Sequence, residues 1–124
     1  FIMAVNWKKA EEYIAAGKGE KVKAKYAHNW YDESTHTATS EMLNEVLQLD
    51  PAVLKDIIYF IPCPKSPHGC DTDPTGEYIV GSGKLAALIP VFSFTKMQQA
   101  IANKEFEGEF AGIPVIKYEA ALHG

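Results

Sequence analysis

The stretch NWKKAEEYIAAGKGEKVKAKYAHNW, residues 6–30, decides the fold, because its hydrophobic period changes partway along. Trp7, Ala10 and Ile14 follow the spacing of one face of a helix. Asn6 stands directly before them and is a residue type that caps the free amides of a first helical turn. The first half of the stretch therefore predicts a helix.

From Glu20 onward, apolar and charged residues alternate, which is the pattern of a half-buried strand. Gly17 and Gly19 separate the two patterns and are suited to end the helix in left-handed backbone geometry. Lysines form the face of the strand that we expect in solvent. The face expected toward the core consists of Val22, Ala24, Tyr26, His28 and Trp30.

Further elements follow from hydrophobic patterns and turn residues. They are a helix over 40–49 that continues briefly beyond Pro51, a strand over 57–61, a rigid loop over 62–76, strands over 77–82 and 84–92, a helix opening at the capping box Thr95-x-x-Gln98 and ending at Asn103, and a terminal hairpin around Gly112. Strands and helices in this order predict an α+β fold with a mixed or antiparallel sheet and three to four short helices. The length of 124 residues predicts a single compact domain spanning residues 1–124.

The charged residues limit the classes of partner. All 12 cationic side chains are lysines, and 16 acidic residues give a net charge of −4. Arginine dominates base readout in the major groove, so a net-acidic chain without arginine does not fit sequence-specific nucleic-acid binding. No apolar run approaches the length of a membrane span, and two cysteines are too few for a secreted disulfide scaffold. We therefore expect a cytoplasmic protein that does not bind membranes and that could form a homo-oligomer.

The segment AHNWYDESTH, residues 27–36, is the first candidate site. If the strand ends near Trp30, aromatic and titratable side chains gather at the rim of the core, as in pockets for small ligands. The expected ligand-binding residues are His28, Trp30, Tyr31, Asp32 and His36. The favoured function is a non-catalytic binding or interaction module that recognises a small molecule or a protein partner through this aromatic-polar rim at residues 28–36.

Two alternatives compete with a binding rim. The segment could be only a polar connector that caps the next helix. It could also serve a small hydrolase or lyase, with His28 or His36 as general base and Asp32 or Glu33 orienting the imidazole.

A second candidate site lies in the predicted loop. Cys63, His68 and Cys70 are ligand types that zinc accepts, and they would suit a metal-containing structural subunit. Their spacing, Cys-x4-His-x-Cys, matches no standard zinc knuckle. Free thiols and a Cys63–Cys70 disulfide are therefore open alternatives, and no cofactor other than a possible zinc is expected.

One short segment resembles a known family. FAGIPVIKYEAAL, residues 110–122, is similar to a Gly-Ile-Pro-Val β-segment near the carboxyl end of tailed-phage capsid proteins. The resemblance covers about a tenth of the chain, and because any sheet-edge hairpin could produce it, it implies no function.

Overall fold

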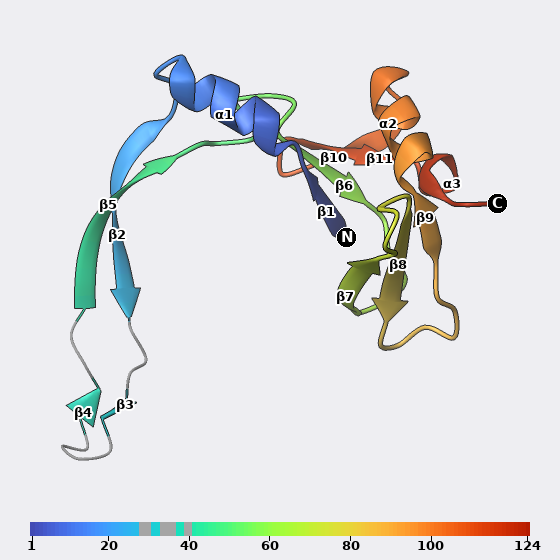
Figure 1. Ribbon diagram of the computed structural model, residues 1–124, viewed down its shortest axis with the longest axis horizontal. Helices are drawn as coiled ribbons and strands as arrows, with labels where there is room; N and C mark the ends of the chain where they lie inside the picture. Colours follow the sequence, from blue (N-terminus) through green and yellow to red (C-terminus); the bar gives the residue numbers. More distant parts are fainter. Residues whose placement is uncertain (28–30, 33–36, 39–40) are drawn as a thin grey trace. The chain divides into compact units, whose positions relative to one another are not determined.

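The computed structural model describes residues 1–27, 31–32, 37–38 and 41–124, with side chains described outside 23–44. By their contacts these residues divide into two compact units. One unit comprises Phe1–Lys9 and Pro51–Gly124, and the other comprises Ala10–Asp50. Each unit is described by itself (Figure 1).

The predicted helix–strand sequence at the start of the chain is confirmed. Helix α1 spans Trp7–Ala15, and the Asn6 Oδ1 atom accepts a hydrogen bond of 3.1 Å from the Lys9 amide, as expected of a cap. Gly17 and Gly19 both have positive φ, and strand β2 (Glu20–Ala27) follows. No residue of α1 is buried within the described structure, and Trp7 is 60% exposed and Ile14 is 50% exposed.

The helix predicted over 40–49 is wrong. Strand β5 (Glu41–Gln48) pairs antiparallel with β2 along its whole length, from Glu20 opposite Gln48 to Ala27 opposite Glu41. The apolar residues behind this prediction are four positions apart, as Met42 is from Val46 and Leu43 is from Leu47. Residues four apart lie on one face of a helix, but because four is an even number they also lie on one face of a strand. Here pairing with β2 prevails over helix propensity. The short strands β3 (Tyr31–Asp32) and β4 (Thr37–Ala38) pair with each other.

The larger unit contains a mixed four-stranded sheet in the order β1-β6-β11-β10. The strands are β1 (Ile2–Val5), β6 (Ile58–Ile61), β10 (Phe106–Phe110) and β11 (Ile113–Ile116). Only the β6–β11 pair is parallel. The predicted strand over 57–61 and the hairpin around Gly112 are therefore confirmed. The hairpin ends sooner than expected, because Tyr118–Ala121 form the short helix α3.

A second, antiparallel sheet has the order β7-β8-β9. It consists of β7 (Pro67–Thr72), β8 (Tyr78–Gly83) and β9 (Val91–Ser93). The segment expected to be a loop over 62–76 thus contains a strand. A turn precedes β8, in which the Gly76 amide donates a bond of 2.9 Å to the Asp73 carbonyl.

The strand predicted over 84–92 is wrong except at its end. The amides of Lys84 and Leu85 donate to the carbonyls of Ser66 and Lys65 instead of joining a ladder. Pro90 has no amide hydrogen to contribute. The segment therefore remains a loop, in which Leu85 is 64% exposed and Ile89 is 71% exposed.

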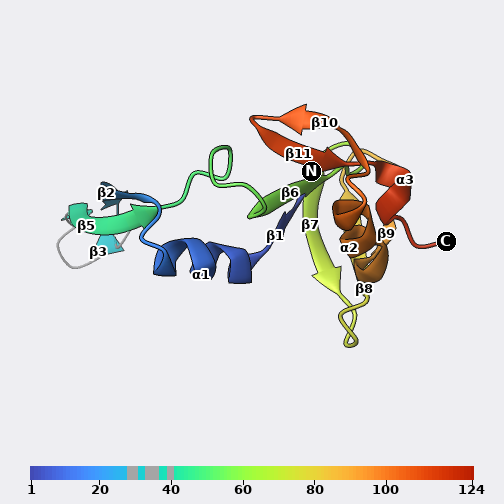
Figure 2. The same cartoon turned by 90° about the horizontal axis from the view of Figure 1, so that it is seen from above.

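Helix α2 (Phe94–Ala102) lies beside α3 and contacts β9 and β11 (Figure 2). Its cap is Ser93, two residues before the predicted Thr95, and its C-cap is Asn103, as expected. The main core includes Tyr59, Ile61, Phe92, Met97, Ala100, Ile116 and Ala121. The opposite face of the four-stranded sheet is also apolar. Phe60 stacks there on Phe1 at 4.9 Å, and Phe110 is 58% exposed.

The fold is α+β, with mixed and antiparallel sheets and three helices in the described part of the chain. The predicted fold class is confirmed. Within the same residues no helix is both long enough and apolar enough to cross a membrane.

Candidate functional site

The first candidate site cannot be placed from the structure. His28, Trp30, Glu33 and His36 lie outside the described residues. The backbones of Tyr31 and Asp32 form β3, opposite Ala38 and Thr37, and their side chains are outside the described set. The binding rim over 28–36 and the alternative hydrolase or lyase site therefore remain predictions.

The structure instead shows a groove beside the second sheet. It has a volume of about 500 Å³. Its wall is formed by His68 on β7, the end of β8, and the loop that follows β8. The lining residues are His68, Ser82, Gly83, Lys84, Ala86, Leu88 and Ile89. An exposed imidazole and a lysine thus stand at a surface that is otherwise largely apolar.

Ser82 holds the two strands together next to His68. The β7–β8 register shifts between Pro67 and Cys70, so the regular ladder is interrupted there. The Ser82 hydroxyl accepts a bond of 3.2 Å from the Gly69 amide and donates one of 3.1 Å to the Gly69 carbonyl. A side chain thereby satisfies backbone groups that the bulge leaves without ladder partners.

The loop after β8 separates this groove from a second one. The second groove has a volume of about 420 Å³ and shares Ala86 and Leu88 with the first. Its other lining residues are Pro62, Cys63, Pro64, Lys65 and Tyr118. Gly83 permits this close approach of loop and strand, since a Cβ atom there would lie 2.8 Å from the Pro64 Cβ atom. The two amide bonds from Lys84 and Leu85 to the 65–66 backbone hold the loop in place.

The residues of the second predicted site are divided between these grooves: His68 lines the first, Cys63 lines the second, and Cys70 lines neither. Cys63 is half-buried, and His68 and Cys70 are exposed. Both cysteines are free thiols. Within the part of the chain that the structure describes, no group of three or more His, Cys, Asp or Glu side chains could hold a metal ion. The metal-binding role of Cys63, His68 and Cys70 therefore stays a prediction.

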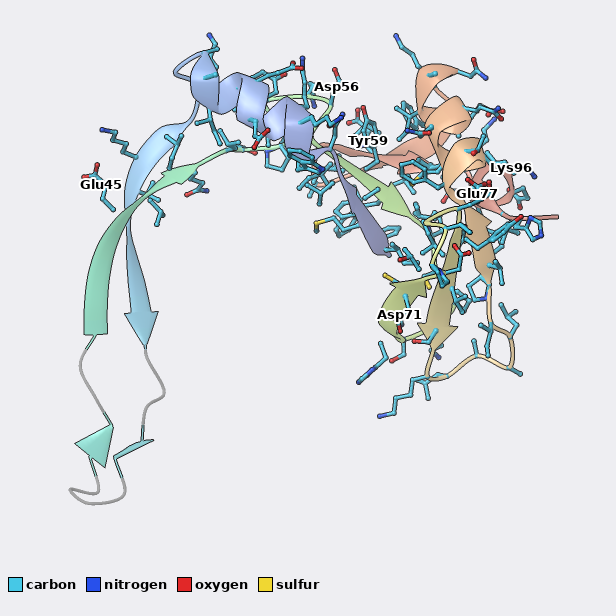
Figure 3. All side chains as sticks on the ribbon, viewed as in Figure 1. Glu45, Asp56, Tyr59, Asp71, Glu77 and Lys96 are labelled. Carbon is cyan, nitrogen blue, oxygen red and sulfur yellow. The ribbon has the colours of Figure 1, made fainter. Side chains whose placement is uncertain are left out.

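Two carboxylates near the second sheet have structural partners. Asp73 accepts bonds from the Tyr78 amide at 3.0 Å and from the Thr75 hydroxyl at 2.7 Å. Glu77 accepts bonds from the hydroxyls of Ser93 and Thr95, at the start of α2 near Lys96 (Figure 3). These bonds favour the charged forms.

The hydrogen bonds lower the pKa values of both carboxyl groups. For Asp73 the largest cause is the Tyr78 amide, and the Thr75 hydroxyl comes next. For Glu77 the largest cause is the Ser93 hydroxyl, followed by that of Thr95. Both carboxylates therefore stabilise local structure, Asp73 at the turn before β8 and Glu77 at the start of α2.

Sequence reasoning missed the groove as a whole. It identified His68 as a ligand type, but it treated the segment 84–92 as a buried strand and so did not expect Lys84, Leu88 or Ile89 beside the imidazole. The signal that was present is Pro90, which interrupts any strand through this segment.

The comparisons with known proteins include a similarity of limited extent. No family model matches the chain. A segment of 45 residues, 36% of the chain, is 36% identical to nitrous-oxide reductase of Stutzerimonas stutzeri. The matched segment corresponds to 7% of the length of that reductase. The chain thus spans only a small part of the curated relative that it matches.

Proposed function

We propose that this chain is a section of an oxidoreductase that reduces nitrous oxide, and that the His68 groove is its contribution to the reaction site. The observation that carries the proposal is the 36% identity over 45 residues to nitrous-oxide reductase. In this proposal the section positions the substrate and supplies a proton, whereas the sequence favoured a non-catalytic binding module at residues 28–36.

The reaction requires protons, and the groove contains a side chain that can donate them. Reduction of N₂O to N₂ and water takes up two electrons and two protons. An imidazole side chain can act as a general acid and deliver a proton to a reacting oxygen. His68 lines the groove, and Leu88 and Ile89 also line it and offer a small neutral molecule an apolar contact surface.

The supply of electrons is not assigned to any described residue in this proposal. An imidazole is also a common ligand of transition metals, and His68 could serve as one such ligand. The described residues do not complete a metal site, as noted above. The proposed part of this chain in the reaction is the positioning of the substrate and the supply of a proton.

A turnover experiment with labelled substrate tests the proposal. The protein, isolated anaerobically with its natural metal complement, is supplied with ¹⁵N-labelled nitrous oxide and a reduced viologen dye. The expected result is release of ¹⁵N₂ with two electron equivalents of dye oxidised per molecule of N₂. If labelled dinitrogen does not exceed the amount formed with heat-denatured protein, the proposal is wrong.

A further inference from the structure

The two cysteines of the chain are brought together by the second sheet. Cys63 follows β6, and Cys70 lies on β7 directly opposite Gly81 of β8. Both are free, with Cys63 half-buried and Cys70 exposed. This arrangement does not depend on the proposed function.

The position of Gly81 shows that both thiols occupy one face of the sheet. Side chains of directly opposed residues project to the same face, with Cβ atoms about 5 Å apart. A Cβ atom built at Gly81 would lie 3.2 Å from the Cys63 sulfur. The Cys63 sulfur therefore fills the space beside Cys70 that a side chain at position 81 would otherwise take. The same sulfur lies 3.9 Å from the Ser82 carbonyl oxygen, on the same strand.

The two thiols differ in exposure. Burial raises the pKa of the Cys63 thiol most, and the Cys70 thiol raises it further. The exposed Cys70 is the thiol that a small reagent reaches first.

We propose that Cys63 and Cys70 form a reversible intramolecular disulfide by exchange with a low-molecular-weight disulfide such as oxidised glutathione. The Cys70 thiolate attacks one sulfur of oxidised glutathione, which forms a mixed disulfide and releases one glutathione thiolate. The Cys63 thiolate then attacks the Cys70 sulfur and releases the second glutathione. Two protein thiols are oxidised, one molecule of oxidised glutathione is reduced to two of glutathione, and the two thiol protons pass to the released glutathione.

The bond would close a loop that carries groove residues. Residues 64–69 lie between the two cysteines and include Lys65 of one groove and His68 of the other. The backbone of this loop already accepts the two bonds from Lys84 and Leu85. Oxidation would therefore restrain one wall of both grooves, and reduction would release it.

Trypsin and mass spectrometry provide a direct test on the full chain. Lys65 lies between the cysteines, so trypsin separates peptide 56–65 from peptide 66–84 unless a disulfide joins them. The protein is equilibrated in glutathione buffers of increasing oxidised fraction, alkylated and digested. In oxidising buffer we expect a monomer that has lost about two mass units, takes up no alkylating reagent, and yields the joined peptides until it is reduced.

Single-cysteine variants supply the matched controls. Cys63→Ser is expected to stop at a Cys70 mixed disulfide with glutathione, whereas the unsubstituted chain passes through that adduct to the closed form. The proposal is overturned if the unsubstituted chain remains alkylated at both cysteines in fully oxidising buffer. It is equally overturned if this chain accumulates the glutathione adduct, or if the two cysteines link separate molecules instead of one.

Discussion

Gly81 makes room for Cys63: a Cβ atom at position 81 would lie 3.2 Å from the Cys63 sulfur. The same atom would lie 3.3 Å from Ile2 and from Pro90. Side chains from three distant parts of the sequence, Cys63, Ile2 and Pro90, thus pack around Gly81. Gly81 is buried, and its amide also donates a bond of 3.0 Å to the Pro90 carbonyl.

Gly81→Ala should therefore destabilise the protein. Overpacking at a well-filled site costs about 1–3 kcal/mol, and we expect a loss of free energy of unfolding in that range. The measurement is urea denaturation under reducing conditions. Gly69→Ala is the control, because no atom lies within 4 Å of a Cβ atom built there. Equal stability losses in the two variants would contradict the close approach at position 81.

Ser93→Ala should weaken the start of α2. The Ser93 hydroxyl accepts a bond of 3.1 Å from the Lys96 amide and donates to Glu77. Loss of a helix cap costs about 1–2 kcal/mol. Thr95→Ala should cost less, because the exposed Thr95 does not cap the helix. Denaturation of both variants measures the difference, and a greater loss with Thr95→Ala would restore the capping box predicted from the sequence.

Ser82→Ala should loosen the bulge beside His68. The substitution removes both bonds between the Ser82 hydroxyl and the Gly69 backbone. The bond from the Gly69 amide contributes about 1 kcal/mol, so hydrogen exchange at this amide should accelerate about fivefold when the bond is lost. Ser82→Thr retains a hydroxyl and should exchange more slowly than the alanine variant. Unchanged exchange in Ser82→Ala would show that the hydroxyl does not hold the two strands.

Acid should destabilise the region around Asp73 and Glu77. The folded-state pKa of each carboxyl group lies below its unfolded value. Their contribution to stability is therefore complete above the unfolded pKa, near 4, and is lost as the pH falls through the lower folded-state values. A pH series of denaturation midpoints should fall below about pH 4. In Asp73→Asn and Glu77→Gln variants this decline should be shallower, whereas a decline as steep as in the unsubstituted chain would assign acid sensitivity to other groups.

The parts of the fold that the sequence predicted are those with strong local signals. Asn6, Gly17 and Gly19 bound α1 as expected, and the turn ending at Gly76 returns the chain into β8. The helix predicted over 40–49 failed because a spacing of four fits both a helix and a strand, and only the partner strand β2 decides between them. Pairing between strands that are distant in the sequence cannot be predicted from a short local segment.

The sequence predicted individual residues of the candidate site but not their surroundings. His68, Cys63 and Cys70 were identified as residue types that can bind a metal, whereas the residues around them depend on the path of the loop 84–90. That loop is held by backbone hydrogen bonds from Lys84 and Leu85 to residues 66 and 65. The pattern of side chains in the sequence does not predict these backbone bonds. The approach of Cys63 to Cys70 likewise depends on the register that sets Gly81 opposite Cys70.

The proposed reductase function is tested most directly by the rate at which ¹⁵N₂ forms in a pair of histidine variants. His68 lines the groove, whereas His123 packs edge-to-face on Tyr78 at 4.7 Å and lines neither described groove. Loss of a positioned proton donor typically costs about 100-fold or more in rate. The account predicts a loss of about that size for His68→Gln and an unchanged rate for His123→Gln. Equal rates of dinitrogen formation in the two variants would contradict it.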